Sequence, residues 1–407
     1  MIDRLIIHAG LHKTGSSSIQ AFLARNRERL STDFDIQVPT IAGLLRRTPD
    51  LRGYATNPSA LAPLAELDSA VCLLSRENFA WIDTPEALIE LQRHCARYAR
   101  QVAVLFYLRR QDALAVSQKQ EGTKWPDCAL AYGHEPAALP SRLSDVAAGY
   151  LDFQRRVGMW GDAFGDRQVT LRVFESDRLH GGDVLADFAA LLELPAGEFD
   201  WQRPLNASLT RRSQLFLHQT RAPVGEHSPA KHFLVLAANL YDRTIQPRDK
   251  LLPGRAEAQA FYAPFVAGNR ALAERFGVEG PADLFTDDFS HYPVVASPAP
   301  LDDAQLRDYL DEMVSAVDRK ADVLMTALER RKDTEGYLGV VPLQFRHRLH
   351  ARPALLGEAC LAAAGRLPAS FGDARLALGD LARRLGAGPL HSRVKRLQFQ
   401  VGRTFGR

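Results

Sequence analysis

Residues 5–20, LIIHAGLHKTGSSSIQ, constrain the fold of this chain more than any other stretch. An apolar run of strand type ends at Gly10, a short loop carries Lys13 and Gly15, and apolar residues at helical spacing begin with Ile19. The first N–H groups of a helix and its positive dipole end attract an anion, and glycine lets the backbone close around it. The sequence therefore predicts an anion-binding loop between a buried strand and a helix, as in a nucleotide site.

Further strands and helices are predicted along the first half of the chain. The predicted strands cover residues 71–75, 102–108 and 169–175, and the predicted helices cover residues 16–30, 84–100 and 184–194. Strands that alternate with helices in this way call for a mostly parallel sheet covered by helices. We therefore predict an α/β, P-loop-like three-layer fold with a central parallel sheet of four or five strands, followed by a helical C-terminal part.

The second half of the chain has a different pattern. Helices are predicted at residues 210–221, 230–247, 255–276 and 302–331. We predict a large domain over residues 1–300, a helical extension over 301–340 and a basic tail over 341–407. The tail carries twelve Lys or Arg against three Asp or Glu, whereas the whole chain has a net charge of +3. We interpret the tail as a solvated extension, with a weak contact to an anionic membrane surface as the alternative.

Composition excludes several classes of protein. The chain has 407 residues, of which 46% are hydrophobic and 24% charged, as in ordinary globular proteins. No stretch approaches the roughly 20 apolar residues of a membrane helix, and the first apolar run is too short for a signal peptide. The four cysteines show no paired spacing. We expect a cytoplasmic protein, with peripheral contact to the inner membrane face as an alternative. Its thiols should be reduced, and we expect no metal and no nucleic-acid partner.

The loop differs from the Walker A loop of ATP and GTP sites. That pattern requires lysine directly after the second glycine, but Ser16 stands there and the lysine is Lys13. In ATP and GTP sites the lysine neutralises the β and γ phosphates together with Mg²⁺. The displaced lysine indicates a ligand with another charge distribution, and a nucleotide-dependent kinase of the P-loop class becomes the less favoured alternative.

The run GLHKTGSSSIQ at residues 10–20 resembles the 5′-phosphosulfate loop of sulfotransferases that use PAPS (3′-phosphoadenylyl sulfate), in their bacterial carbohydrate-type branch. In that family an arginine after a later strand, and a serine eight residues on, hold the 3′-phosphate. Arg109 and Ser117, in YLRRQDALAVS, have this spacing. The resemblance covers roughly residues 4–210, with weaker matches at 75–79 (SRENF) and in the N-x-S-L turn of Asn206 to Leu209.

The resemblance implies a set of nucleotide-binding residues in the loop. The backbone N–H groups that would hold the 5′-phosphate belong to Thr14, Gly15, Ser16 and Ser17. Lys13 would bind the same phosphate and stabilise the negative charge that develops on it as the sulfuryl group leaves. A sulfuryl group in transit carries less charge than a phosphoryl group, so that positioning and local cations suffice without a metal.

The acceptor hydroxyl needs a general base to remove its proton, and the sequence offers two candidates. Glu77 follows the predicted strand at 71–75, where a partly desolvated carboxylate can take up a proton. The resemblance supports Glu77, because a glutamate serves as the base in several Golgi-type relatives. Others use histidine, which makes His12 the rival. Arg76 stands where a smaller residue is usual, and its pairing with Glu77 would weaken that carboxylate as a base.

The paired motifs predict a PAPS-dependent sulfotransferase, with residues 1–300 as its catalytic domain. It would transfer the sulfuryl group in line to a hydroxyl of a carbohydrate-type acceptor, such as a surface glycan, a glycolipid or a small sugar conjugate. Adenosine 3′,5′-bisphosphate would be released. A non-catalytic module that binds a nucleotide or glycan is the alternative from another class.

Other residues have two interpretations each. Trp81, Trp125 and Tyr132 are candidates for an acceptor cleft, because sugars stack on aromatic faces, or else belong to the core. Lys119 and Lys124 would either attract an anionic substrate or form a solvated face. Arg110 is interpreted as a surface residue, with a ligand-binding residue as the alternative.

Overall fold

The structure, a computed structural model, describes a defined part of the chain: residues 1–48, 53–195, 197, 199–201, 208–224, 229–243, 245, 249–280, 283–296, 300–302, 304–313 and 315–316. It divides into two compact units. Unit 1 comprises Met1–Gln118, Ser141–Asn206 and Pro253–Ala296, and unit 2 comprises Lys119–Pro140, Ala207–Leu252 and Ser297–Arg407. The predicted basic tail lies outside the described residues, so the predicted divisions at 300 and 340 stay predictions.

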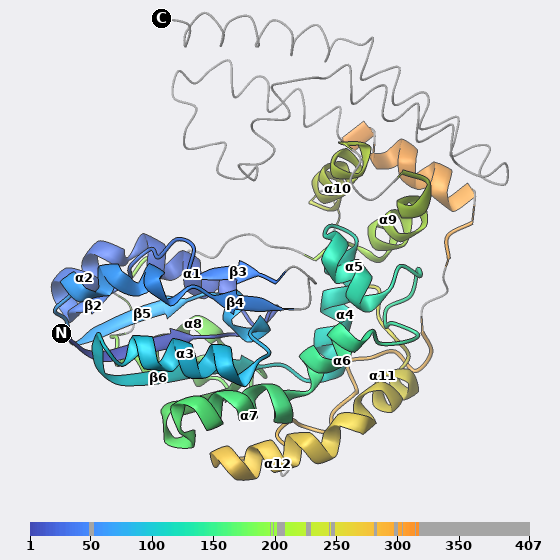
Figure 1. The fold of residues 1–407 in the computed structure, drawn as a ribbon. Helices are drawn as coiled ribbons and strands as arrows, with labels where there is room; N and C mark the ends of the chain where they lie inside the picture. Colours follow the sequence, from blue (N-terminus) through green and yellow to red (C-terminus); the bar gives the residue numbers. More distant parts are fainter. Residues whose placement is uncertain are drawn as a thin grey trace, which may run out of the picture. The chain divides into compact units, whose positions relative to one another are not determined.

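Unit 1 is built on a parallel sheet of five strands in the order β2-β5-β1-β6-β7 (Figure 1). The strands are β1 (Ile2–His8), β2 (Ile36–Gln37), β5 (Val71–Ser75), β6 (Ala99–Leu108) and β7 (Val169–Val173). The predicted α/β fold with a parallel sheet of four or five strands is confirmed. Only β2 was not predicted, because two residues are too few to show a periodic pattern.

The central strand β1 lies between β5 and β6, with Leu5 opposite Cys72 on one side and Val102 on the other. The chain passes from β1 to the edge strand β2, returns to β5, and then crosses β1 to reach β6. Parallel α/β sheets bind their ligands outside the carboxyl ends of the strands, where the direction of winding changes. The residues that follow β1, β5 and β6 share this edge.

Helices cover both faces of the sheet in unit 1 (Figure 1). On one face, α1 (Ser16–Arg25), α2 (Arg27–Phe34) and α8 (Val184–Leu191) share a core cluster with Ile6 and Leu105. On the other, α3 (Pro85–Cys95) and α7 (Phe153–Phe164) contact β6, and α12 (Val266–Phe276) contacts α7. Burial of apolar side chains against both faces produces the predicted three layers.

Several short elements complete unit 1. Antiparallel strands β3 (Leu45–Arg47) and β4 (Tyr54–Thr56) form a separate pair. The remaining elements are η1 (Pro58–Glu66), η2 (Glu77–Trp81), α6 (Asp145–Leu151), η3 (Asp166–Gln168), η4 (His180–Gly182), α11 (Arg255–Tyr262) and η5 (Ala263–Phe265).

Unit 2 is helical in its described residues, as predicted for the C-terminal part. It contains the end of α4 (Gln111–Gly122), which begins in unit 1, with α5 (Pro126–Tyr132), α9 (Arg211–Val224), α10 (Pro229–Asp242) and a helical segment over 304–313. Phe216, Leu234 and Tyr309 are among its buried core residues. None of the described helices combines the length and the apolar character needed to cross a lipid bilayer.

Two predicted helices are interrupted. The prediction over 16–30 is wrong at Asn26, whose side chain donates hydrogen bonds to the carbonyls of Phe22 and Asp200 and accepts one from the Asp200 N–H. These bonds compete with helix continuation, so α1 ends and α2 begins there. The prediction over 255–276 is wrong at 263–265, where Pro264 removes a backbone donor and a 3₁₀ turn separates α11 from α12.

Candidate active site

The loop predicted to bind an anion joins β1 to α1. Lys13 and Gly15 have φ angles of 64° and 82°, so that the chain turns sharply just before the helix. A Cβ atom on Gly15 would lie 2.7 Å from Cγ1 of Val184, so this position requires glycine for both its φ angle and its space. In α1, which begins at Ser16, the N–H groups of Ser18 and Ile19 donate to the carbonyl of Gly15. The N–H groups of Ser16 and Ser17 precede these bonds and can donate to a ligand.

Two hydroxyl groups of the loop stabilise its shape. Thr14 Oγ1 and Ser16 Oγ donate hydrogen bonds to the carbonyl of Leu11, at 2.6 Å and 3.1 Å, and both side chains are buried. The side chains of Lys13 and Ser17 are exposed. The loop therefore presents backbone N–H groups, one cation and one hydroxyl, while its other polar side chains are used internally.

His8 lies beneath this loop, at the carboxyl end of β1. Its Nδ1 lies 2.7 Å from Ser75 Oγ at the end of β5, and the side chain is buried. A Cβ atom on Gly10 would lie 2.5 Å from His8 Nε2, so glycine lets the loop pass over the ring. Burial lowers the pKa of His8 to about 4, which keeps the imidazole neutral at pH 7. His8 was not predicted as a site residue. The one signal for it in the sequence is that a polar side chain stands at the end of an apolar strand.

Arg109 connects the second predicted motif to the first. It follows β6, and its Nη1 donates a hydrogen bond to the carbonyl oxygen of Lys13 at 3.1 Å. Desolvation lowers the pKa of Arg109 from its usual range. Ser117 lies farther along α4 and is buried, with 8% of its surface exposed. No hydrogen bond joins Ser117 to the loop within the part of the chain that the structure describes.

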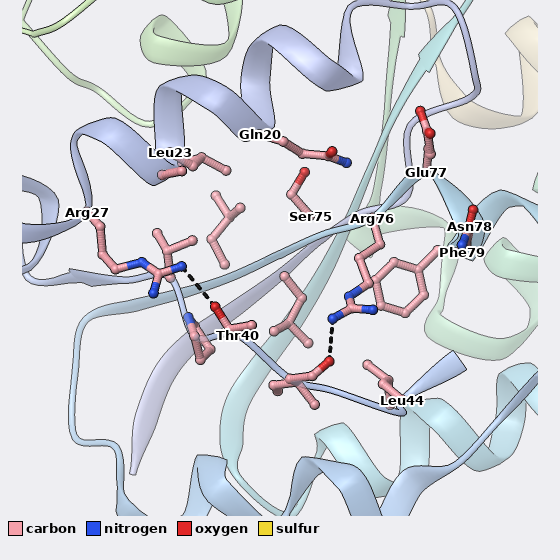
Figure 2. Close-up of a pocket in the computed structure, with 16 residues that line it drawn as sticks. Gln20, Leu23, Arg27, Thr40, Leu44, Ser75, Arg76, Glu77, Asn78 and Phe79 are labelled. Atoms are coloured by element: carbon pink, nitrogen blue, oxygen red, sulfur yellow. Dashed lines mark hydrogen bonds between the residues drawn. The ribbon is translucent and has the colours of Figure 1, made fainter. Parts of the chain in front are cut away.

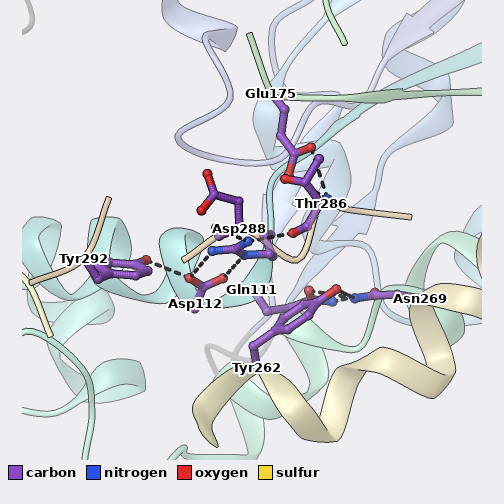
Figure 3. Close-up of polar contacts among 9 residues, drawn as sticks. Gln111, Asp112, Glu175, Tyr262, Asn269, Thr286, Asp288 and Tyr292 are labelled. Atoms are coloured by element: carbon purple, nitrogen blue, oxygen red, sulfur yellow. Dashed lines mark hydrogen bonds and ion pairs between the residues drawn. The ribbon is translucent and has the colours of Figure 1, made fainter. Parts of the chain in front are cut away.

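Arg110, the next residue, is not the surface residue that was predicted. Only 5% of it is exposed, and it makes two bonds to Asp112, from Nε at 2.8 Å and from Nη2 at 3.1 Å. Its Nη1 donates to the carbonyls of Thr286 and Asp288, at 2.7 Å and 2.8 Å. Tyr292 donates to Asp112 at 2.7 Å, as Figure 3 shows. Arg110 is therefore a structural residue whose charge is fully paired.

The two candidate bases lie beside each other. His12 Nε2 is 3.7 Å from Glu77 Oε1. The hydroxyl of Tyr150, in α6, lies 2.9 Å from His12 Nδ1 and accepts a hydrogen bond from the His12 N–H at 3.1 Å. When the phenol donates to Nδ1, the proton of the neutral imidazole is on Nε2 and faces Glu77. Tyr150 was missed from the sequence, because a single tyrosine in an amphipathic helix has no distinguishing pattern.

One of the three aromatic candidates belongs to this site. Trp81 stacks on Tyr150 with ring centroids 4.1 Å apart, and its ring centroid is 6.0 Å from that of His12. In unit 2, Tyr132 is buried in the core, whereas 49% of Trp125 is exposed. Trp81 is thus the aromatic side chain next to the candidate bases.

Arg76 does not pair with Glu77 in the described residues. Its guanidinium donates to the carbonyl oxygen of Ile41. Figure 2 shows Arg76 and Glu77 pointing in opposite directions from the end of β5. In this arrangement the Arg76 guanidinium therefore does not neutralise the carboxylate of the candidate base Glu77.

The two lysines after Ser117 lie in unit 2 and are paired. Lys119 is almost completely buried, so the prediction of a solvated face is wrong for it. Its Nζ donates to the carbonyl of Tyr132 at 3.1 Å and lies 3.2 Å from Glu135. Lys124 pairs with Glu121 at 3.2 Å. In the same unit, Ser208 is exposed, while Asn206 of the predicted turn lies outside the described residues.

The described residues contain no cluster of three or more His, Cys, Asp or Glu side chains suited to a metal ion. No protein-family model matches the chain, and no curated protein matches it. The structure is similar to that of a sulfotransferase from Alicyclobacillus acidocaldarius, with 16% sequence identity, a TM-score of 0.36, and coverage of 66% of this chain and 95% of that chain. A likeness this distant says nothing about activity, which must be argued from the residues of this chain.

Proposed function

We propose that this chain is a sulfotransferase that uses PAPS and transfers its sulfuryl group to a hydroxyl of a carbohydrate-type acceptor. The observation that carries the proposal is the hydrogen bond from Arg109 to the carbonyl of Lys13. It brings together the two motifs that resemble the 5′- and 3′-phosphate sites of this family, although 96 residues separate them.

The chemistry of the available groups fits PAPS. Anionic phosphates need cations and N–H donors, and the loop offers the start of α1 together with Lys13. Arg109 adds a second cation, bonded to the backbone carbonyl of Lys13, and Ser117 would complete the 3′-phosphate site of the resemblance. When bound, PAPS supplies an activated sulfuryl group, whose bond to the 5′-phosphate oxygen breaks as a bond to the acceptor oxygen forms.

The residues of this chain would then share the work of the transfer. Lys13 and the first N–H groups of α1 stabilise the charge that develops on the departing phosphate. The proton of the acceptor hydroxyl passes to the Glu77–His12 pair, in which Glu77 is the favoured base and His12 its rival. Tyr150 orients His12 through its bonds to the ring and the backbone.

A transfer assay tests this proposal. Purified protein is incubated with radiolabelled PAPS and fractionated bacterial envelope or capsule glycans, with the Lys13→Ala variant as the control. Label should enter a glycan fraction with the wild type and be strongly reduced with the variant. Binding of adenosine 3′,5′-bisphosphate without any transfer would favour the non-catalytic module, and Mg²⁺-dependent ATP turnover would favour the kinase.

A further inference from the structure

A cavity of about 380 Å³ lies in unit 1 between α1, the segment 38–44 and the carboxyl end of β5 (Figure 2). This volume falls within the usual range of small-molecule sites, about 300 to 1,000 Å³. Glu77 forms part of its lining, so the cavity extends to the candidate base. The nucleotide-binding loop itself, residues 10–17, does not line it.

Two guanidinium groups line this cavity without a carboxylate partner among the described residues. Arg27 Nη2 donates to Thr40 Oγ1 at 3.0 Å, and Arg76 donates to the carbonyl of Ile41. Both acceptors are neutral. Each guanidinium has five N–H donors, so most donors of both groups stay available to a ligand.

Other arginines of unit 1 differ from Arg27 and Arg76 because they pair with carboxylates. Arg29 lies 3.3 Å from Asp33 one turn along the same helix, and Arg110 forms its two-bond contact with Asp112. In those cases a carboxylate of the chain neutralises the cation. Two uncompensated guanidiniums on one cavity attract an anion, because a charge-assisted hydrogen bond to an oxyanion is about twice as strong as a neutral one.

The rest of the lining suits a sugar. Gln20 and Asn78 carry amides and Ser75 a hydroxyl, which can pair with sugar hydroxyls, while Pro39 and Leu44 add apolar surface. Figure 2 shows Gln20 and Ser75 close together at the end of the cavity toward Glu77, and Arg27 and Arg76 farther from it. A ligand with an anionic group at the arginines can therefore present a hydroxyl toward Glu77.

We propose that this cavity binds a sugar bearing an oxyanion, either the carboxylate of a uronic acid or a sulfate ester, through Arg27 and Arg76. Its role as the acceptor subsite, with the free hydroxyl directed to Glu77, rests on the proposed sulfotransferase function. The binding of the anionic sugar does not depend on that function.

Calorimetric or NMR titrations test the binding. The probes are methyl glucuronide, glucose monosulfate and the neutral methyl glucoside. One or both anions should bind at least about tenfold more tightly than the glucoside, and Arg27→Gln should remove most of this preference. Arg25→Gln is the matched control, because Arg25 is an exposed arginine at the end of α1, two residues before Arg27, and does not line the cavity. Which anion binds better distinguishes a uronic acid from a sulfated sugar.

Equal affinity for glucoside and both anions, or an unchanged preference in Arg27→Gln, would overturn the proposal. Arg76→Gln could perturb the segment around Ile41, so Arg76→Lys is the second variant, retaining the charge and part of the binding. Thermal unfolding of each variant establishes that it is folded.

A titration with adenosine 3′,5′-bisphosphate separates this inference from the proposed function. Arginine-dependent sugar binding without nucleotide binding would refute the sulfotransferase and leave the anionic-sugar site standing. Nucleotide binding without sugar binding would refute the cavity assignment alone. Displacement of the sugar by the nucleotide would also overturn it, because the cavity would then belong to the nucleotide site.

Discussion

Arg109 and Arg110 are consecutive residues after β6, yet they serve opposite purposes. Arg110 is buried, contacts two carbonyls and Asp112, and lies over the ring of Phe289 with 3.8 Å from its guanidinium carbon to the ring centroid. Arg109 contacts the carbonyl of Lys13 in the candidate phosphate loop. One guanidinium is neutralised by a carboxylate, whereas the other is bonded to a neutral backbone carbonyl.

This difference separates a structural cation from a functional one. Burying a charge is costly unless a partner compensates it, and Asp112 does so for Arg110. Arg109 instead donates to a backbone carbonyl of the candidate phosphate loop, a neutral partner that does not neutralise its charge. A guanidinium held by a neutral carbonyl at the carboxyl edge of a parallel sheet is therefore a candidate group for binding an anionic ligand.

The largest expected effect is the loss of stability on removing Arg110. Arg110→Ala leaves the buried Asp112 with Tyr292 as its one hydrogen-bond donor among the described residues, so the free energy of unfolding should fall by about 3–5 kcal/mol. Urea denaturation measures this. Arg109→Ala is the control and should change stability by less than about 1 kcal/mol. Equal losses for the two variants would remove the distinction between them.

Lys13→Ala should lower the rate of transfer and leave the stability of the fold unchanged. Removing a preorganised group that stabilises the departing phosphate should cost about 2.7 to 4 kcal/mol of transition-state stabilisation, roughly a hundredfold to a thousandfold in rate. Stability should stay unchanged, because Lys13 is exposed. Transfer from radiolabelled PAPS measures the rate, with the exposed Lys250→Ala as control. Undiminished turnover in the Lys13 variant would contradict its role.

Glu77→Gln should lower the rate of transfer about a hundredfold, because the amide cannot accept the acceptor proton. Binding of adenosine 3′,5′-bisphosphate should be retained. His12→Ala is the comparison, and Tyr150→Phe, which removes both bonds to His12, should have a smaller effect on the rate. Near-normal turnover by the glutamate variant together with an inactive histidine variant would assign the base to His12.

His8 should make stability depend on pH. Burial lowers its pKa from 6.5 to about 4, so below pH 6.5 the unfolded chain binds a proton that the folded chain does not. The free energy of unfolding should therefore fall by about 2 kcal/mol from pH 7.5 to pH 5, through this residue alone. Denaturation of the wild type and of His8→Asn at both pH values isolates the effect. An identical pH dependence in the two proteins would show that His8 does not titrate in this way.

The layers of unit 1 could be predicted because its strands are mostly buried and its helices amphipathic, so short apolar runs identify β5, β6 and β7. The candidate phosphate residues could be predicted because they cluster in two short motifs. Such clusters follow from local geometry, since one loop and one helix start provide most of the donors.

Other parts of the site depend on contacts between distant segments. Tyr150 reaches His12 across 138 residues, and Ser75 reaches His8 across 67. The burial of Arg110 depends on Thr286 and Asp288, which lie more than a hundred residues away in sequence. Periodicity and spacing describe only near neighbours, so they could not show that Arg110 is buried and paired.

The central claim is that Arg109 and Lys13 form adjacent phosphate sites. The most direct test is to titrate the protein with adenosine 3′,5′-bisphosphate and with adenosine 5′-phosphate, which lacks the 3′-phosphate. The bisphosphate should bind at least about tenfold more tightly, and Arg109→Gln should abolish this preference. Equal affinity of the wild-type protein for the two nucleotides, or no binding of either, would contradict the claim.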